Sequence, residues 1–199
     1  SRVEDEVEPA DAAAVVDVPR RSRAAVRGRS DAALVRAAEG GSVAAVDELF
    51  RRHWPAAHRA AFLVVHDAAA AEDIAQEAFL GALRALGRFD RRRPFRPWLH
   101  RIVVNRAIDF ARARALRHEV GEPVERAAPV RPAPDEDLLA ALAALAPDQR
   151  AAVVLRHLLG YTPGEIARML DLPRGTVNSR VRRGLDALAA RLREDGDEA

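Results

Sequence analysis

The residues best suited to contact DNA lie at the start of one predicted helix near the C-terminus. Arginine, serine, threonine and asparagine side chains form hydrogen bonds with phosphates and base edges. Gly175, at the same end of the helix, would let a phosphate approach the free N–H groups and the positive end of the helix dipole. Taken alone, the pattern also fits a solvated arginine-rich face that binds nothing. The candidate DNA-binding side chains are Arg174, Thr176, Asn178, Ser179, Arg182 and Arg183.

Residues 160–192, which must position these side chains, are predicted to form a helix-turn-helix. Thr162 and Glu165 have the spacing of a capping box, and Pro163 between them suits the first position of a helix. Pro173 predicts the end of that helix, because the residue before a proline is displaced from the helical region. A short helix, a tight turn and a basic second helix are typical of DNA readers. Apolar spacing along the second helix predicts one buried stripe of Val177, Val181, Leu185, Leu188 and Leu192.

A second concentration of arginine lies between residues 84 and 117. This segment holds eleven arginines and two aspartates, a balance of +9, whereas the whole chain carries only +2. Segregated charge of this kind indicates a surface for a polyanion. A proline-broken loop at 89–97 leads into a helix predicted from about residue 98 to 116. Such a loop and helix could hold a single strand with a base stacked on an aromatic ring, although Phe89 and Trp98 individually favour the core.

A carboxylate-rich face is predicted on the helix that begins after Asp67. The spacing places a core stripe on one side of this helix and Asp73, Gln76, Glu77 and Leu80 together on another. Such a face suits docking onto an arginine-bearing partner helix, and a plain solvated face is equally compatible. The predicted core stripe is Ile74, Ala75, Ala78, Phe79, Ala82, Leu83 and Leu86.

The remaining patterns predict an all-α protein of two small helical domains. Asp31 and Ser42 are expected to cap two earlier helices, and Pro55 could kink the second. Residues 118–134 contain four prolines and no hydrophobic stripe, which predicts a flexible linker. The expected organisation is a disordered extension (1–30), an N-terminal helical domain (31–117), the linker (118–134), a C-terminal helix-turn-helix domain (135–193) and an acidic tail (194–199).

Composition argues against several classes of protein. The chain has no cysteine, which excludes disulfides, thiolate metal sites and cysteine nucleophiles. Its six histidines lack zinc-binding spacing, and neither a glycine-rich phosphate loop nor a G-x-S-x-G motif is present. We therefore expect no enzyme activity, no metal and no cofactor. No apolar stretch approaches the roughly 20 residues of a membrane helix, and we expect a cytoplasmic protein.

Three segments, in this order, resemble bacterial RNA polymerase sigma factors of the extracytoplasmic-function (ECF) group. The resemblance covers about residues 31–193 and implies a factor that directs transcription initiation, while nucleotide chemistry belongs to the polymerase. The runner-up is a conventional helix-turn-helix regulator, which would not explain the arginine-dense loop. The three segments are AEDIAQEAFLGALRAL (71–86), FDRRRPFRPWLHRIVVNRAIDFAR (89–112) and GYTPGEIARMLDLPRGTVNSRVRRGLDAL (160–188).

The resemblance implies a role for each candidate surface. The face of Asp73, Gln76, Glu77 and Leu80 would dock on a coiled coil of the largest subunit of core RNA polymerase. The helix-turn-helix residues given above would read the minus-35 promoter element. The basic loop and following helix would recognise and open the minus-10 element through Arg91, Arg92, Arg93, Arg96, Trp98, Arg101, Asn105 and Asp109.

The resemblance also implies how these surfaces are used. Asn178 stands where many relatives carry Lys or Arg, and asparagine favours adenine edges, so promoter preference should not be transferred from a relative. Free in solution the chain would be a tethered pair of weak DNA binders, which core polymerase holds at promoter spacing. Such factors are commonly held inactive by an anti-sigma protein, so we expect one as a partner.

Overall fold

The computed structural model describes residues 26–119 and 136–197, and in these ranges the chain is helical without strands. The expected all-α fold with two helical domains is confirmed. The first domain holds α2 (Asp31–Glu39), α3 (Val43–Val65), α4 (Ala68–Arg84), a 3-10 turn (Leu86–Arg88) and α5 (Phe95–Glu119). The second holds α6 (Glu136–Ala143), α7 (Pro147–Val153), a π-helical turn (Val154–Leu158), α8 (Pro163–Leu170) and α9 (Arg174–Asp197). None of the described helices is long and apolar enough to cross a membrane.

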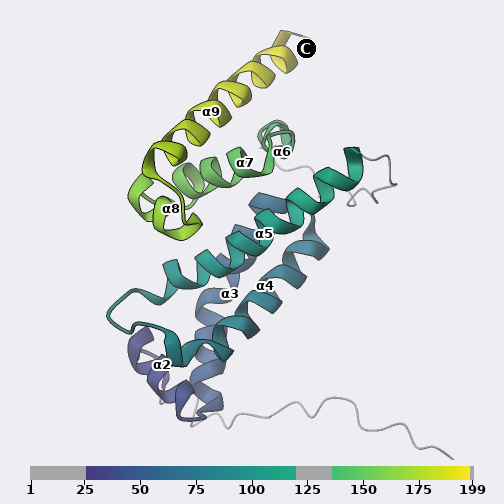
Figure 1. Ribbon diagram of the computed structural model, residues 1–199. Helices are drawn as coiled ribbons and strands as arrows, with labels where there is room; N and C mark the ends of the chain where they lie inside the picture. Colours follow the sequence, from purple (N-terminus) through teal and green to yellow (C-terminus); the bar gives the residue numbers. More distant parts are fainter. Residues whose placement is uncertain (1–25, 120–135, 198–199) are drawn as a thin grey trace, which may run out of the picture.

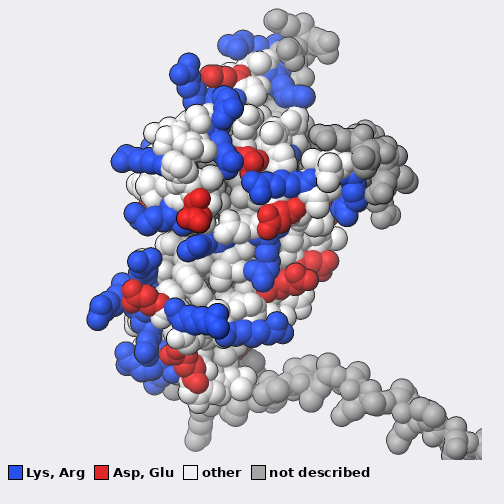
Figure 2. All heavy atoms as spheres, viewed as in Figure 1, with Lys and Arg blue, Asp and Glu red and all other residues white. Residues whose placement is uncertain are grey.

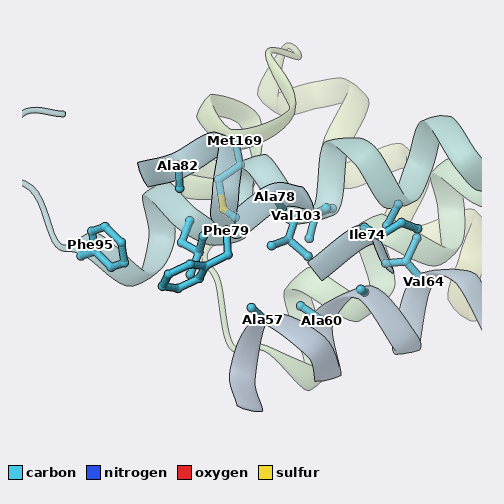
Figure 3. Close-up of a cluster of buried hydrophobic side chains, with 14 of the residues drawn as sticks. Ala57, Ala60, Val64, Ile74, Ala78, Phe79, Ala82, Phe95, Val103 and Met169 are labelled. Atoms are coloured by element: carbon cyan, nitrogen blue, oxygen red, sulfur yellow. The ribbon is translucent and has the colours of Figure 1, made fainter. Parts of the chain in front are cut away.

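Helices α3, α4 and α5 pack side by side in the first domain, with α2 at one end (Figure 1). Alanine lines much of the contact, and its small side chain lets the helix backbones approach closely. Ala57 and Ala60 of α3 face Ala78 and Ala82 of α4 in one buried cluster (Figure 3). The predicted core stripe of α4 is confirmed, with Leu83 only partly buried.

Helix caps mostly follow the sequence, with one shift. Ser42 and Asp67 accept from the backbone N–H three residues ahead, as N-caps do. At α2 the cap is Ser30 rather than the expected Asp31, because Ser30 has the extended backbone (ψ 154°) and its hydroxyl accepts from Ala33 N. The described chain begins before this helix, and Val26, which falls in the range expected to be disordered, is buried in the core.

Helix α5 is longer than predicted at both ends. It begins at Phe95, because that ring is buried against Phe89 and Trp98 and fixes the first turn. It continues to Glu119, so the first two residues of the expected linker are helical, and the rest of that linker lies outside the described residues.

The helix-turn-helix of the second domain forms as predicted. Thr162 and Glu165 make both hydrogen bonds of the capping box, and Pro163 occupies the first helical position. The helix ends at Leu170, and its C-cap residue Asp171, two residues before Pro173, has a left-handed backbone (φ 54°). The π-helical turn that links α7 to Gly160 was not anticipated.

The predicted stripe along α9 was only partly right. Val177 and Leu188 are buried and Val181 is half-buried, but Leu185 and Leu192 remain 39% and 41% exposed. The cause is Gly184, a residue without a side chain, whose buried backbone packs against α7. The buried face therefore runs through Gly184 rather than Leu185. Helix α9 also continues to Asp197, into the range expected to be an acidic tail.

The two domains pack against each other rather than forming a separated pair. Helix α5 contacts α7 and α8, and α3 contacts α6 and α7. Met169 of α8 points into the same buried cluster as Phe79 and Val103 of the first domain (Figure 3). One hydrophobic core therefore spans the domain boundary.

Candidate nucleic-acid and polymerase interfaces

The predicted DNA-reading residues of α9 lie on an exposed part of the helix-turn-helix. The turn at residues 171–173 separates α8 from α9, and a Cβ added at Gly175 would meet nothing within 4 Å outside the adjoining turns of α9. Thr176 is half-buried, so its side chain is less accessible to DNA than the other five. The exposed members are Arg174, Asn178, Ser179, Arg182 and Arg183.

Two of these side chains are held by their own helix. The Ser179 hydroxyl donates to the Thr176 carbonyl (2.9 Å), and the Arg183 Nε donates to the Ser179 carbonyl (3.2 Å). Arg182 lies 3.9 Å from Asp186, a distance and exposure at which an ion pair contributes little. Arg183 is thus oriented before any ligand arrives, whereas the Arg182 side chain is 85% exposed.

The predicted minus-10 residues form a basic edge on the first domain. Figure 2 shows arginine side chains along one side of the molecule, from the helix-turn-helix down to the loop before α5. Arg91 pairs with Glu39 (3.4 Å) and Arg93 with Asp90 (3.6 Å). All four loop arginines, Arg91, Arg92, Arg93 and Arg96, are exposed.

Trp98 has two environments. One part of its ring packs on Phe89 and Phe95, with centroids 4.8 and 5.5 Å away. The rest lines a cavity of about 460 Å³ between the domains. Trp98 therefore packs with the core on one side and lines the cavity on the other. The cavity is lined by Arg93, Pro94, Pro97, Trp98 and Arg101 of the first domain and Glu165, Arg168 and Met169 of the second.

Asn105 and Asp109 lie further along the same side of α5. The Asn105 Nδ2 donates to the Met169 carbonyl of α8 (3.3 Å), so this side chain faces the second domain. Asp109 is exposed, and its Oδ1 lies 3.7 Å from an Arg112 nitrogen. The structure thus places Trp98, Arg101, Asn105 and Asp109 along one face of α5, with the second domain over part of it.

The predicted polymerase-binding residues share one exposed face of α4. Asp73, Gln76 and Glu77 are exposed, and Leu80 keeps 47% of its surface accessible. Their neighbours Ile74, Ala75, Ala78 and Phe79 are buried in the first domain. The face combines two carboxylates with an exposed leucine, the composition of a helical docking surface.

A charged cluster at the domain boundary is not predicted by the sequence. Asp148 of α7 accepts from Arg112 of α5 (2.6 Å) and lies 3.4 Å from Arg180 of α9. No local pattern pointed to this contact, because an acidic residue in the first turn of a helix is explained by the helix dipole alone. We call Asp148, Arg112 and Arg180 the Asp148 cluster.

Arg150 forms a buried link between the domains. Its Nη1 donates to the Val64 carbonyl of α3 (2.6 Å), and its Nη2 donates to Ala143 and Leu145 carbonyls within the second domain. Burial, with a smaller contribution from Arg114, lowers the Arg150 pKa to about 10. The guanidinium therefore remains charged at neutral pH and joins three backbone carbonyls.

His100 of α5 and Tyr161 before α8 form a second buried link. The Tyr161 hydroxyl lies 2.8 Å from the His100 Nδ1. Burial lowers the pKa of His100 to about 4, with further lowering by Arg96 and His53, so the ring is neutral at pH 7 and its Nδ1 can accept. Burial raises the pKa of Tyr161, which keeps its hydroxyl as the donor.

Comparisons with known proteins agree with this architecture. Models of Sigma-70 region 2 and Sigma-70, region 4 match residues 49–117 and 135–188. The ECF RNA polymerase sigma factor SigM of Mycobacterium tuberculosis is 43% identical over 82% of this chain and 85% of its own length. The RNA polymerase sigma factor CarQ of Myxococcus xanthus is 34% identical over 77% and 92%.

Two solved structures share the fold. CnrH, in complex with the cytosolic domain of CnrY, gives a TM-score of 0.64 at 30% identity, over 84% of this chain and 99% of its own. The sigma factor RpoE of Bartonella quintana, in complex with the anti-sigma factor NepR, gives 0.63 at 24% identity, over 74% and 96%. Both sigma-70 regions match, and sigma factors of the ECF group match over most of their length. The chain therefore belongs to the ECF family of RNA polymerase sigma factors.

Proposed function

We propose that this protein binds core RNA polymerase, recognises the minus-35 and minus-10 promoter elements and promotes strand opening for transcription initiation. The observation that carries the proposal is that one chain joins region 2 and region 4 and exposes a separate surface on each of α4, α5 and α9. Catalysis belongs to the polymerase, so the protein itself is not an enzyme. It acts in the cytoplasm, where its polymerase and promoters are.

The polymerase contact is assigned to the exposed face of α4. Asp73 and Glu77 supply negative charge for an arginine-bearing coiled coil of the largest subunit, and Gln76 and Leu80 supply hydrogen bonding and apolar contact between them. Charge complementarity of this kind sets the orientation of docking. The packing of α4 against α3 and α5, which leaves this face exposed, supports the assignment.

The minus-10 contact is assigned to the loop before α5 and to the exposed face of that helix. The loop arginines would neutralise the backbone of the displaced strand, while Trp98 and Arg101 would hold an unstacked base. Capturing bases that only the melted state offers draws the equilibrium toward strand opening. The residues proposed are Arg91, Arg92, Arg93, Arg96, Trp98, Arg101, Asn105 and Asp109.

The minus-35 contact is assigned to the first turns of α9. The exposed amide of Asn178 can form two hydrogen bonds with an adenine edge, whereas an arginine reads guanine. The residues proposed are Arg174, Thr176, Asn178, Ser179, Arg182 and Arg183. An anti-sigma partner is also part of the proposal, because the family is commonly inhibited by proteins that cover these faces.

In vitro transcription with core polymerase on fragmented genomic DNA tests the function directly. Discrete transcripts that depend on the added protein, and that share upstream elements at two positions, are expected. A pull-down of core polymerase separates this function from a conventional helix-turn-helix regulator. Tight binding to a palindrome by the protein alone, without retention of core polymerase, would instead identify such a regulator.

A further inference from the structure

We propose that the second domain and the minus-10 strand bind to the same face of α5, so that only one of them can occupy it at a time. In this proposal the Asp148 cluster stabilises the arrangement of the free protein in which the second domain covers that face, here called the closed arrangement. The inference rests on the proposed function only for the identity of the strand. The closed arrangement itself follows from contacts between the domains.

The first line of support is that the two uses of α5 share residues. Asn105, proposed to meet promoter DNA, donates to the Met169 carbonyl. Trp98 and Arg101 line the cavity whose opposite wall is Arg168 and Met169 of α8. A strand laid along this face must take the place of α8, so both cannot be bound at once.

The second line is the position of Asp148. This one carboxylate contacts an arginine from each promoter-reading helix, Arg112 of α5 at 2.6 Å and Arg180 of α9 at 3.4 Å. The Arg180 side chain is only 19% exposed, because it points at α7 rather than outward with Arg182 and Arg183. The carboxylate thus forms ion pairs with two arginines that could otherwise pair with a DNA phosphate.

Away from the Asp148 cluster, the boundary combines apolar packing with buried hydrogen bonds, among them the Tyr161–His100 pair and those of Arg150. Tyr161, Ile166 and Met169 are buried in the core cluster that includes Val103 and Val104 of α5. The Asp148 cluster is accessible to solvent, with the Arg112 side chain 52% and the Asp148 side chain 31% exposed. A polyanion or a partner can therefore reach the ionic contacts before the apolar core separates.

The polymerase face remains open in this arrangement. Asp73, Gln76, Glu77 and Leu80 on α4 are exposed while the α5 face is partly covered. The geometry therefore orders the steps: the closed protein can dock on core polymerase, and the second domain must leave α5 before the minus-10 strand binds. Free protein is thereby kept from competing for promoters that it cannot open.

The distance between the domains tests the closed arrangement without DNA. Because the chain has no cysteine, Ala69→Cys on α4 and Ala189→Cys on α9, both exposed, give a clean fluorophore pair for single-molecule energy transfer. We expect one short-distance population in the parent protein. Asp148→Asn should raise the ratio of open to closed molecules by about two- to ten-fold, as expected for the loss of partly exposed ion pairs.

Asp186→Asn is the matched control, because it adds the same unit of positive charge and removes the Arg182 pair without touching α5. Its distance distribution should equal that of the parent. If Asp148→Asn perturbs folding, Arg112→Gln, which removes the contact from the α5 side, must open the protein similarly. Equal distributions in the parent and in Asp148→Asn and Arg112→Gln would overturn the proposal.

Competition is tested with a fluorescent mixed-sequence single strand of DNA and no polymerase. Affinity should rise in Asp148→Asn by the same factor as the open fraction, and beyond any rise in Asp186→Asn. Opening without this gain would refute competition for α5. Absence of transcription by the parent protein with core polymerase would instead refute the proposed function, and would leave the distance result standing.

Discussion

Val153 of α7 packs directly against the backbone of Gly184 in α9. A β-carbon added at Gly184 would lie 2.6 Å from the Cγ2 of Val153, closer than real contacts allow. This close approach helps to determine which face of α9 is buried, and therefore the direction in which the side chains proposed to read DNA project.

Gly184→Ala should therefore destabilise the protein, although alanine ordinarily favours a helix over glycine by about 1 kcal/mol. The overpacked methyl is expected to cost a net of about 1–3 kcal/mol. Gly164→Ala in α8 is the control, since nothing lies within 4 Å of its added β-carbon, and it should be neutral or stabilising. Urea unfolding measures both, and equal effects would show that Gly184 is not a close contact.

Local sequence patterns predicted the helix caps and helix faces, because these features depend on residues close together in the chain. The capping box of Thr162 and Glu165 formed because its two hydrogen bonds lie within a single helical turn. The exposed and buried faces of α4 followed from the helical period, and Asp67 capped that helix. Even here a choice between adjacent capping residues was settled by backbone geometry, which selected Ser30 over Asp31.

Contacts between distant segments could not be predicted in the same way. Leu185 fits the apolar repeat of α9 as well as Leu188 does, and the packing of α6 and α7 against α9 decides that Leu188 is the buried one. The Asp148 cluster joins three helices of two domains, and nothing in the local spacing of Asp148 reveals its partners. The assignment of polymerase and promoter contacts to individual residues stays a prediction.

Glu77→Arg should weaken binding to core polymerase at least ten-fold while leaving the fold intact. The side chain is exposed on α4, so the change adds no strain to the core, and it places like charges together at the proposed docking face, a juxtaposition that costs several kcal/mol. Glu72→Arg is the control, because it makes the same change on an exposed flank of the same helix. Unchanged affinity for Glu77→Arg would remove this face from the interface.

Arg183→Ala should cost about 1–3 kcal/mol in promoter binding and relax preference at one upstream position. Arg183 is already oriented by its hydrogen bond to the Ser179 carbonyl, which suits it to reading a base. Arg191→Ala, on an exposed later turn of α9, should leave preference unchanged. Binding by the holoenzyme to a library varied in the minus-35 element provides the measurement, and a loss that is uniform across sequences would make Arg183 a phosphate contact.

The stability of the protein should fall as the pH drops from about 6.5 toward 4. Burial lowers the pKa of His100 and of His66 to about 4, whereas the unfolded residues titrate near 6.5. Between these values the unfolded chain binds more protons, so the free energy of unfolding decreases with decreasing pH.

His100 should contribute a distinct part of this dependence, because its protonated Nδ1 could no longer accept from Tyr161. The charge would also face Arg96 on its own helix and His53 on α3, both of which disfavour it. His100→Gln should therefore be less stable at pH 7, because it loses the buried hydrogen bond and ring packing with Tyr161. Its free energy of unfolding should also decrease less steeply toward pH 4. His157→Gln, at an exposed position, should keep the parent slope. Denaturant unfolding at a series of pH values distinguishes the cases, and a parental slope in His100→Gln would mean that His100 is not the neutral acceptor at the domain boundary.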